Sequence, residues 1–270
     1  QKTRKEEGAA SSTVNKEMEL LRGMFNAMAK WEWIDRNPMP EGSVTPLRAP
    51  KGRTDFFSVP EWRKLLEALA AVPAPAPGRN RQAHSTSDLI PVIRTLLYTG
   101  GRLTEILTLT WGDVDLEERH LILSRRKTDS VTGLRISPQL AEVLEALPRG
   151  TPAAYVFTRP NGLPWEAYHV QRAFYRARDR AKLRKSLTVH SLRHTFASWL
   201  VADGVPLKVV SELLGHASVT QTERYSHLAP SHLADAVDRI GDIESRETGS
   251  GGTRAPRSTS EKPLDMLRKR

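Results

Sequence analysis

Four short segments of the chain carry residue types that suit chemistry on a phosphate group. Arginine offers a planar fork of donors that stays charged at any working pH and matches phosphate oxygens. Histidine and lysine can move protons, and a tyrosine hydroxyl can act as a nucleophile. The segments are residues 99–105 with Arg102, residues 125–128 with Lys127, residues 190–193 with His190 and Arg193, and residues 213–216 with His216, followed nine residues later by Tyr225.

The spacing within two of these segments predicts that their side chains converge. His190 and Arg193 are three residues apart, so on a helix they share one face. The N-terminus of such a helix also favours a phosphate, because its backbone N–H groups and its dipole are positive there. Gly215 stands where the C-cap of a helix is expected, and this turn would direct His216 toward the same pocket.

The surroundings of Tyr225 decide whether its hydroxyl can react. Ser218 and Gln221 form the pattern of a capping box, which predicts a helix over residues 218–226 that carries Tyr225. A tyrosine at its reference pKa of about 10 is mostly protonated at neutral pH. It therefore needs a neighbouring cation or base, and the arginines and His190 are candidates.

A metal site is the alternative interpretation of one histidine pair. His190 and His194 are four residues apart, which is the spacing of zinc ligands on a helix. The three residues between them are Ser-Leu-Arg, without the glutamate that serves as general base in helical zinc proteases, and Arg193 would repel a cation. We therefore expect no metal, and we expect His194 to pack or to support its neighbours.

In this order and at these separations, the segments resemble the catalytic domain of tyrosine recombinases, the phage integrase family, over about residues 55–236. Residues 13–38 resemble the end of the core-binding domain that precedes it in this family. The resemblance implies a role for each position. It makes Tyr225 the nucleophile, and Arg102 and Arg193 the clamp on the scissile phosphate. His190 matches the histidine beside the second arginine, and His216 the histidine, sometimes tryptophan, that supports the phosphate. Lys127 becomes the proton donor to the leaving group, and Glu105 a carboxylate that steadies the site.

The resemblance also implies a function. It predicts a site-specific recombinase or integrase that acts on double-stranded DNA as a homotetramer, through a 3′-phosphotyrosine intermediate, without metal, cofactor or ATP. Two alternatives stay open: a type IB topoisomerase-like enzyme that relaxes DNA, and a non-catalytic DNA-binding protein on the same fold. The choice of Lys127 is open as well, since Arg125 and Arg126 are neighbours in a turn of uncertain register.

The elements that must position these residues follow from hydrophobic periodicity, caps and turn residues. The pattern predicts a mainly α-helical fold with a small antiparallel β-sheet, an α+β architecture like that of tyrosine recombinases and type IB topoisomerases. The predicted strands are about residues 121–123 and 134–136, around a turn at 130–133. The predicted helices are about residues 13–34, 58–71, 88–98, a short one to 108, 138–147, 166–180, 190–203, 206–214, 218–226 and 231–240.

Four regions are expected along the chain. Residues 1–37 would be the C-terminal part of a truncated core-binding domain, and the proline-rich residues 38–54 a linker. Residues 55–240 would form the catalytic domain, before a disordered Gly/Ser/Thr/Arg-rich tail at 241–270. Leu233, Val237 and Ile240 give the last helix an apolar face, which would dock on a neighbouring protomer or pack on its own domain.

Composition narrows the classes of partner. The chain has 41 Lys and Arg against 31 Asp and Glu, a net charge of +10, and an isoelectric point near 10.0, which is typical of a nucleic-acid binder. It has no cysteine, so disulfides and thiolate metal sites are excluded. No apolar run approaches the roughly 20 residues that span a bilayer, and no leader pattern opens the chain. We therefore expect a cytoplasmic, nucleoid-associated protein without a membrane partner.

Overall fold

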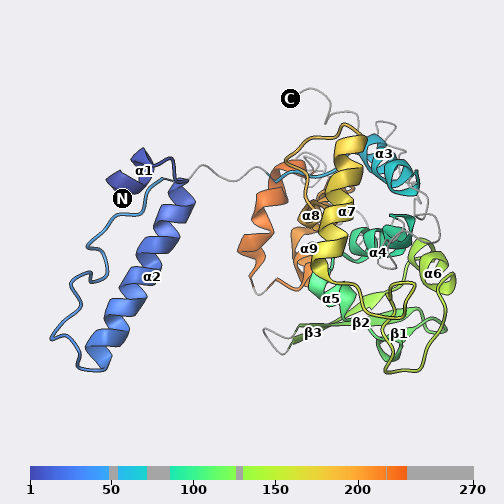
Figure 1. Cartoon of the computed structure of the whole chain (residues 1–270), viewed down its shortest axis with the longest axis horizontal. Coiled ribbons are helices and arrows are strands. Elements are labelled where there is room, and N and C mark those ends of the chain that lie inside the picture. Colours follow the sequence, from blue (N-terminus) through green and yellow to red (C-terminus); the bar gives the residue numbers. More distant parts are fainter. Residues whose placement is uncertain (49–53, 72–85, 126–129, 217, 230–270) are drawn as a thin grey trace, which may run out of the picture. The chain divides into compact units, whose positions relative to one another are not determined.

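The computed structural model describes residues 1–48, 54–71, 86–125, 130–216 and 218–229. The chain forms two compact units, Gln1–Arg53 and Thr54–Arg270 (Figure 1). Among the helices in the described ranges, none combines the length and the apolar character that crossing a membrane requires.

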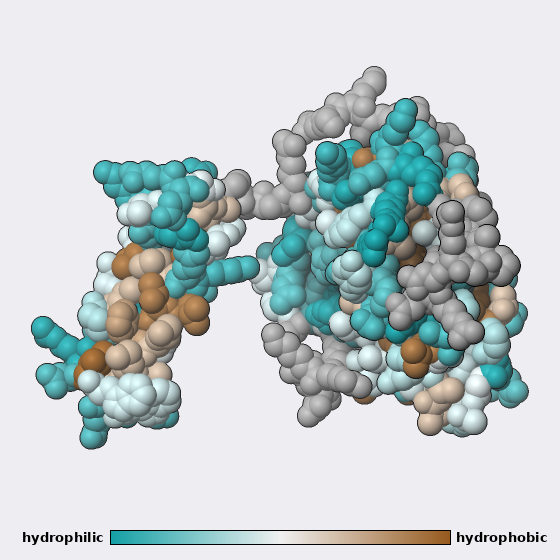
Figure 2. All heavy atoms as spheres, viewed as in Figure 1, coloured by the Kyte–Doolittle hydropathy of each residue, from teal (hydrophilic) through white to brown (hydrophobic). Residues whose placement is uncertain are grey.

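The N-terminal unit consists of helix α1 (Lys2–Glu6), helix α2 (Ser11–Lys30) and the segment that follows them. Helix α2 ends four residues before the predicted Ile34, because the chain turns at Glu32 with a positive φ of 57°. Val14 is the one buried residue of α2, whereas Leu20 and Met24 are exposed. Apolar side chains accordingly show along this unit in Figure 2.

The segment after α2 packs along this helix. The Asn15 side chain donates to the Leu47 carbonyl at 2.9 Å and accepts from the Leu47 backbone N–H at 2.8 Å. Met39 is buried. Much of the predicted linker over residues 38–54 is therefore part of the N-terminal unit, up to at least Leu47.

The second unit is built around helix α4 (Ile90–Thr99), whose buried Val92, Ile93, Leu96 and Leu97 lie in the main hydrophobic core. Helices α3, α5, α6 and α8 all contact α4. The other helices of this unit within the described ranges are α3 (Val59–Ala70), α5 (Leu103–Leu107), α6 (Pro138–Glu145), α7 (Ala167–Arg180), α8 (His190–Ala202), α9 (Leu207–Leu214) and the 3₁₀ helices η1 (Ser87–Leu89), η2 (Trp111–Asp113), η3 (Val219–Gln221) and η4 (Glu223–Leu228).

The predicted start of a helix at Ser58 is confirmed. Ser58 caps α3 through a full capping box: its hydroxyl accepts from the Glu61 N–H, and the Glu61 carboxylate accepts from the Ser58 N–H at 2.9 Å. Arg184, far along the chain, donates to the carboxylates of Glu61 and Asp55. This network fixes the point at which the chain enters the second unit.

A three-stranded antiparallel sheet lies beside α5 (Figure 1). Its strands are β1 (Val114–Asp115), β2 (His120–Arg125) and β3 (Ser130–Arg135), in the order β1-β2-β3. The predicted turn at residues 130–133 is wrong, because these residues belong to β3 and pair with β2 in a register that sets Leu121 opposite Leu134. The connection is residues 126–129, so Lys127 and Arg126 lie outside the described residues.

The predicted helix over residues 218–226 is also wrong in type. The chain forms the two 3₁₀ helices η3 and η4 instead, with i→i+3 bonds such as Tyr225 N–H to the Thr222 carbonyl at 3.0 Å. Ser218 accepts from the Thr220 N–H, so the expected capping box with Gln221 is absent from this segment. The predicted helix at 231–240, with Leu233, Val237 and Ile240, and the tail after it lie outside the described residues. The fold class, mainly α with a small antiparallel sheet, is confirmed.

Candidate active site

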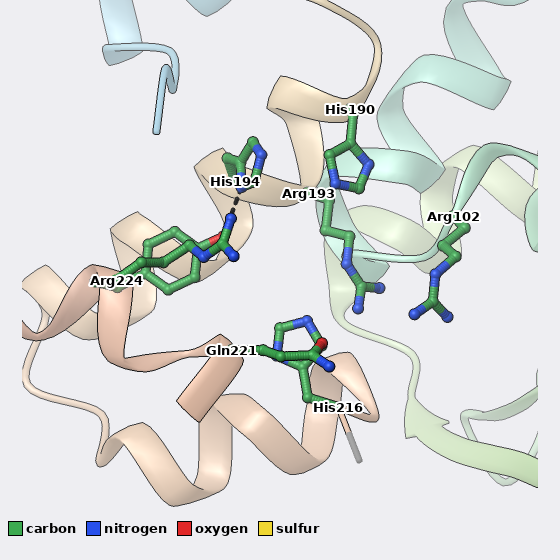
Figure 3. Close-up of a pocket in the computed structure, with 8 residues that line it drawn as sticks. Arg102, His190, Arg193, His194, His216, Gln221 and Arg224 are labelled. Atoms are coloured by element: carbon green, nitrogen blue, oxygen red, sulfur yellow. Dashed lines mark hydrogen bonds between the residues drawn. The ribbon is translucent and has the colours of Figure 1, made fainter. Parts of the chain in front are cut away.

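Five of the seven residues singled out in the sequence line one open pocket in the second unit (Figure 3). The pocket lies between the start of α5, the first turns of α8, the turn after α9, and the 3₁₀ helices η3 and η4. Its lining residues are Arg102, His190, Arg193, His194, His216, Gln221, Arg224 and Tyr225.

Arg102 is held at the rim of the pocket by Glu105. Arg102 is the N-cap of α5 and has an extended backbone. The Glu105 carboxylate accepts from the Arg102 backbone N–H at 2.9 Å and from its guanidinium at 2.7 Å. The Glu105 side chain is 6% exposed and that of Arg102 is 43% exposed. Glu105 therefore anchors the arginine from behind, and the guanidinium reaches the pocket.

Arg193 is almost fully buried, with 4% exposure. Its guanidinium donates to the Gly100 carbonyl and to the Leu214 carbonyl, each at 2.7 Å. These carbonyls lie at the C-terminal ends of α4 and α9, where helices leave acceptors without intrahelical partners. Two helix ends thus orient this cation, and its guanidinium and that of Arg102 point the same way, to one side of His216 (Figure 3).

Two glycines at the end of α4 allow this helix to end close against α8. Gly100 ends α4 in the left-handed region, at φ 62° and ψ 11°, which L-residues with a side chain avoid. A Cβ on Gly100 would lie 2.5 Å from the Phe196 ring, and one on Gly101 would lie 2.9 Å from Ile106. The Thr-Gly-Gly-Arg sequence is therefore needed for α4 to end against α8.

His190 begins α8, and its ring lies next to the Arg193 side chain (Figure 3). Burial lowers the pKa of His190, and the positive charges of Arg193, Arg102 and Arg224 lower it further. Its ring meets that of His194 edge to face, with 4.7 Å between the ring centroids.

His216 reaches the pocket through the predicted glycine turn. Gly215 caps α9 in the left-handed region at φ 55° and ψ 50°, and the His216 N–H donates to the Ser211 carbonyl at 3.0 Å. The His216 Nδ1 lies 2.8 Å from the hydroxyl of Thr222, which is fully buried. This contact ties the turn after α9 to the segment that carries Tyr225.

Tyr225 is 2% exposed and packs against Ala197, Val201 and Leu214, yet it lines the pocket. Its hydroxyl lies 2.6 Å from Nδ1 of His194 (dashed in Figure 3). Burial raises the pKa of Tyr225, and the nearby charges of Arg224 and Arg193 lower it only in part. The hydroxyl is therefore protonated at neutral pH.

Three residues that line the pocket were not predicted as site residues from the sequence. His194 had been expected to pack or to support its neighbours, and it contacts the tyrosine hydroxyl directly. Arg224 and Gln221 line the pocket from η4 and η3. Their only signal was proximity to Tyr225 in the sequence, because the predicted α-helix would have distributed these side chains differently from two 3₁₀ turns.

The electrostatics of the pocket favour an anion. Arg102, Arg193 and Arg224 bring three guanidinium groups to it, and burial with these charges keeps His190 neutral. In the described part of the chain, no group of three or more His, Asp or Glu side chains is placed to hold a metal ion. The donor set of planar cations beside a tyrosine hydroxyl suits a phosphodiester.

Comparison with known proteins places this fold and site in a class. The structure of the Tn1549 transposon integrase in complex with a circular intermediate DNA has the same fold, with a TM-score of 0.69 over 88% of this chain and 82% of that one, at 21% identity. The tyrosine recombinase XerC of Halalkalibacterium halodurans is 27% identical over 85% of this chain and 76% of its own length. The fold and the sequence are thus similar to those of tyrosine recombinases.

The family assignment follows from the second unit. The model of the phage integrase family matches residues 56–232, and the chain therefore belongs to this family. The integrase of Salmonella phage P22 is 30% identical over 68% of this chain. The chain spans 53% of the length of that integrase, so it matches only part of such a relative.

Proposed function

We propose that this protein is a site-specific recombinase that cleaves and rejoins DNA through a covalent bond between Tyr225 and a 3′ phosphate. One observation carries the proposal: the pocket brings a tyrosine hydroxyl together with two arginines that are anchored by Glu105 and by two helix ends. These are a nucleophile and a clamp for the charge that develops on the phosphate.

In this reaction the Tyr225 oxygen attacks the scissile phosphorus, and the bond from phosphorus to the 5′ oxygen breaks. Arg102 and Arg193 stabilise the charge on the nonbridging oxygens, because fixed donors aimed at developing charge lower the barrier most. His190 and His216 support the phosphate from either side. Lys127, by the family resemblance, protonates the departing 5′ oxygen. The phosphotyrosyl bond keeps the energy of the diester, so religation by a 5′ hydroxyl needs no ATP.

Double-stranded DNA at a specific site is the proposed partner. The net charge of +10 supports this choice, as does the relative from Tn1549, which was solved with a circular intermediate DNA. A homotetramer that exchanges strands between two duplexes, in the cytoplasm and associated with the nucleoid, completes the proposal. Its proposed regions are the core-binding end at 1–37 together with the segment up to Leu47 that packs on it, a linker in the rest of 38–54, the catalytic domain at 55–240 and the tail at 241–270.

Tyr225→Phe tests the proposal. A nicked suicide substrate in excess EDTA should trap a covalent protein–DNA adduct with the native chain. Tyr225→Phe should bind the DNA but form no adduct, whereas Tyr155→Phe, at an exposed tyrosine outside the pocket, should react normally. Digestion should yield a peptide with phosphotyrosine at position 225, joined to the 3′ side of the break.

A serine adduct, a 5′ linkage or an active Tyr225→Phe protein would each overturn this assignment. Strand exchange between two differently marked duplexes then separates a recombinase from an enzyme that only relaxes DNA. An adduct without exchanged products at any protein concentration would favour the relaxing activity.

A further inference from the structure

We propose that His194 is the base that takes the proton of Tyr225 when the tyrosine attacks, an inference that rests on the proposed function. From the sequence, the arginines and His190 are the candidates for activating Tyr225. The geometry points to the histidine one turn further along α8.

The contact between the two side chains is short and is built into the fold. His194 Nδ1 lies 2.6 Å from the Tyr225 hydroxyl, although the residues are 31 positions apart. Helix α8 contacts η4 along this part of the chain, and Tyr225 is held by a small core of its own. The hydroxyl therefore meets an imidazole nitrogen, a group that can both accept a hydrogen bond and take the proton.

The charges around His194 keep its imidazole able to accept. Burial lowers the pKa of His194 to about 4, helped by His190 and Arg193 on α8, Arg224 on η4 and His216 after α9. The ring is neutral at pH 7, so with Nε2 protonated its Nδ1 accepts the hydroxyl hydrogen. A neutral acceptor is what a protonated tyrosine requires.

Binding of DNA should make His194 a stronger base. A phosphate bound between Arg102 and Arg193 adds negative charge to the pocket and offsets the cations that disfavour a charged His194. The proton affinity of His194 then rises when the scissile phosphate is in place. The tyrosine is held protonated in the empty pocket and is activated only with substrate bound.

His194 takes the Tyr225 proton in cleavage and gives it back in religation. The Tyr225 oxygen forms a bond to phosphorus, its proton passes to His194 Nδ1, and the bond to the 5′ oxygen breaks as that oxygen takes a proton from its own donor. In religation the incoming 5′ hydroxyl attacks phosphorus and loses its proton to that donor. His194 returns the proton to the departing Tyr225 oxygen.

His194→Asn separates accepting a hydrogen bond from taking a proton. The amide oxygen of Asn stands about where Nδ1 stands and can accept from the hydroxyl, but it cannot be protonated at these pH values. We expect adduct formation to slow by at least about a hundredfold, with DNA affinity and Tm close to those of the native chain. His227→Asn, the same change at an exposed histidine two residues after Tyr225, should keep the native rate.

A substrate with sulfur in place of the bridging 5′ oxygen sharpens the test. Its thiolate leaves without a proton, so it restores the rate of a variant that lacks only the leaving-group acid. The His194→Asn defect should persist on this substrate, because deprotonation of Tyr225 is still needed.

The pH profile on the sulfur substrate gives a second readout. In the native chain the rate should rise with pH and level off once His194 is neutral in the complex. In His194→Asn it should keep rising about tenfold per pH unit, as hydroxide-dependent ionisation of Tyr225 takes over. A His194→Asn rate within about threefold of native, with the native pH profile, would overturn the inference, and so would full rescue by sulfur.

These results are distinct from failure of the proposed function. If the native chain forms no adduct, or if Tyr225→Phe forms one, the nucleophile itself is misassigned. If Tyr225→Phe is inactive and His194→Asn behaves as native, only the role of His194 is lost.

Discussion

Arg193 serves two purposes with one guanidinium. It donates to the Gly100 and Leu214 carbonyls while lining the pocket, so the fold uses the same group that the proposed chemistry needs. Arg102 differs, because its side chain is 43% exposed and its partner is the carboxylate of Glu105. Substitution of Arg193 and substitution of Arg102 should therefore differ in their effect on the free energy of unfolding.

Arg193→Lys should lose both functions. A lysine keeps the charge but lacks the planar fork, so we expect cleavage of the suicide substrate to slow at least about a hundredfold. At least one buried carbonyl also loses its donor, which should lower the free energy of unfolding by about 1–3 kcal/mol. Urea denaturation and adduct kinetics measure the two effects.

Arg102→Lys is the matched comparison. Its cleavage rate should fall on a similar scale, while the free energy of unfolding stays within about 0.5 kcal/mol of native, as for an exposed position. Equal destabilisation in both variants, or cleavage by Arg193→Lys within about threefold of native, would contradict the assigned geometry.

At the scale of elements, the site depends on where three helices stop and start. Helix α4 ends at Gly100 and α9 ends at Gly215, both in the left-handed region, and α8 begins at His190 between them. The ends of α4 and α9 supply the carbonyls that hold Arg193. The glycines matter because they let these ends approach, so a methyl group at one of them should disturb the pocket.

Gly100→Ala tests this dependence. The new Cβ would lie 2.5 Å from the Phe196 ring, and the left-handed backbone adds strain. We expect a loss of more than about 2 kcal/mol in the free energy of unfolding, together with slower cleavage because the Gly100 carbonyl shifts away from Arg193.

Gly162→Ala is the control that separates the backbone strain from the clash with Phe196. Gly162 has φ 79° but nothing within 4 Å of its Cβ position, so it should cost only about 1–2 kcal/mol for the backbone and leave cleavage unchanged. If Gly100→Ala is no more costly than Gly162→Ala and cleaves normally, the close packing of α4 against α8 is not what positions Arg193.

At the scale of the whole molecule, charge governs binding. The chain carries +10 net charge, and its proposed ligand is a phosphate polymer whose counterions are released on binding. The pocket itself concentrates three arginines. Affinity should thus depend strongly on ionic strength.

We expect the Kd for a duplex with the recombination site to rise by roughly a thousandfold between 50 and 200 mM salt, as for proteins with about six phosphate contacts. Fluorescence anisotropy titrations would measure it. Tyr225→Phe, which removes no charge, should give the same slope, whereas Arg102→Ala should lower the slope by about 1. Tight binding that barely changes over this range would show that phosphate contacts do not dominate.

The sequence by itself determined the features that depend on neighbouring residues. The helix start at Ser58, the glycine C-cap at Gly215 and the strand at residues 121–123 all formed as predicted. Such signals act within a few residues, where side-chain chemistry selects the backbone conformation. The motif residues also indicated the family, because their types and order reflect one kind of phosphate chemistry.

Only the tertiary structure decided which residues from distant parts of the sequence lie in contact. The hydrogen bond between His194 and Tyr225 joins residues 31 positions apart in the sequence, and the one from Arg193 to Gly100 joins residues 93 positions apart. The 3₁₀ form of η3 and η4 also depends on tertiary contacts, since Tyr225 packs on α8 and Thr222 bonds to His216. Burial and packing overrode the local helical preference there. Because those contacts join distant parts of the chain, spacing alone could not reveal that His194 holds the hydroxyl of Tyr225.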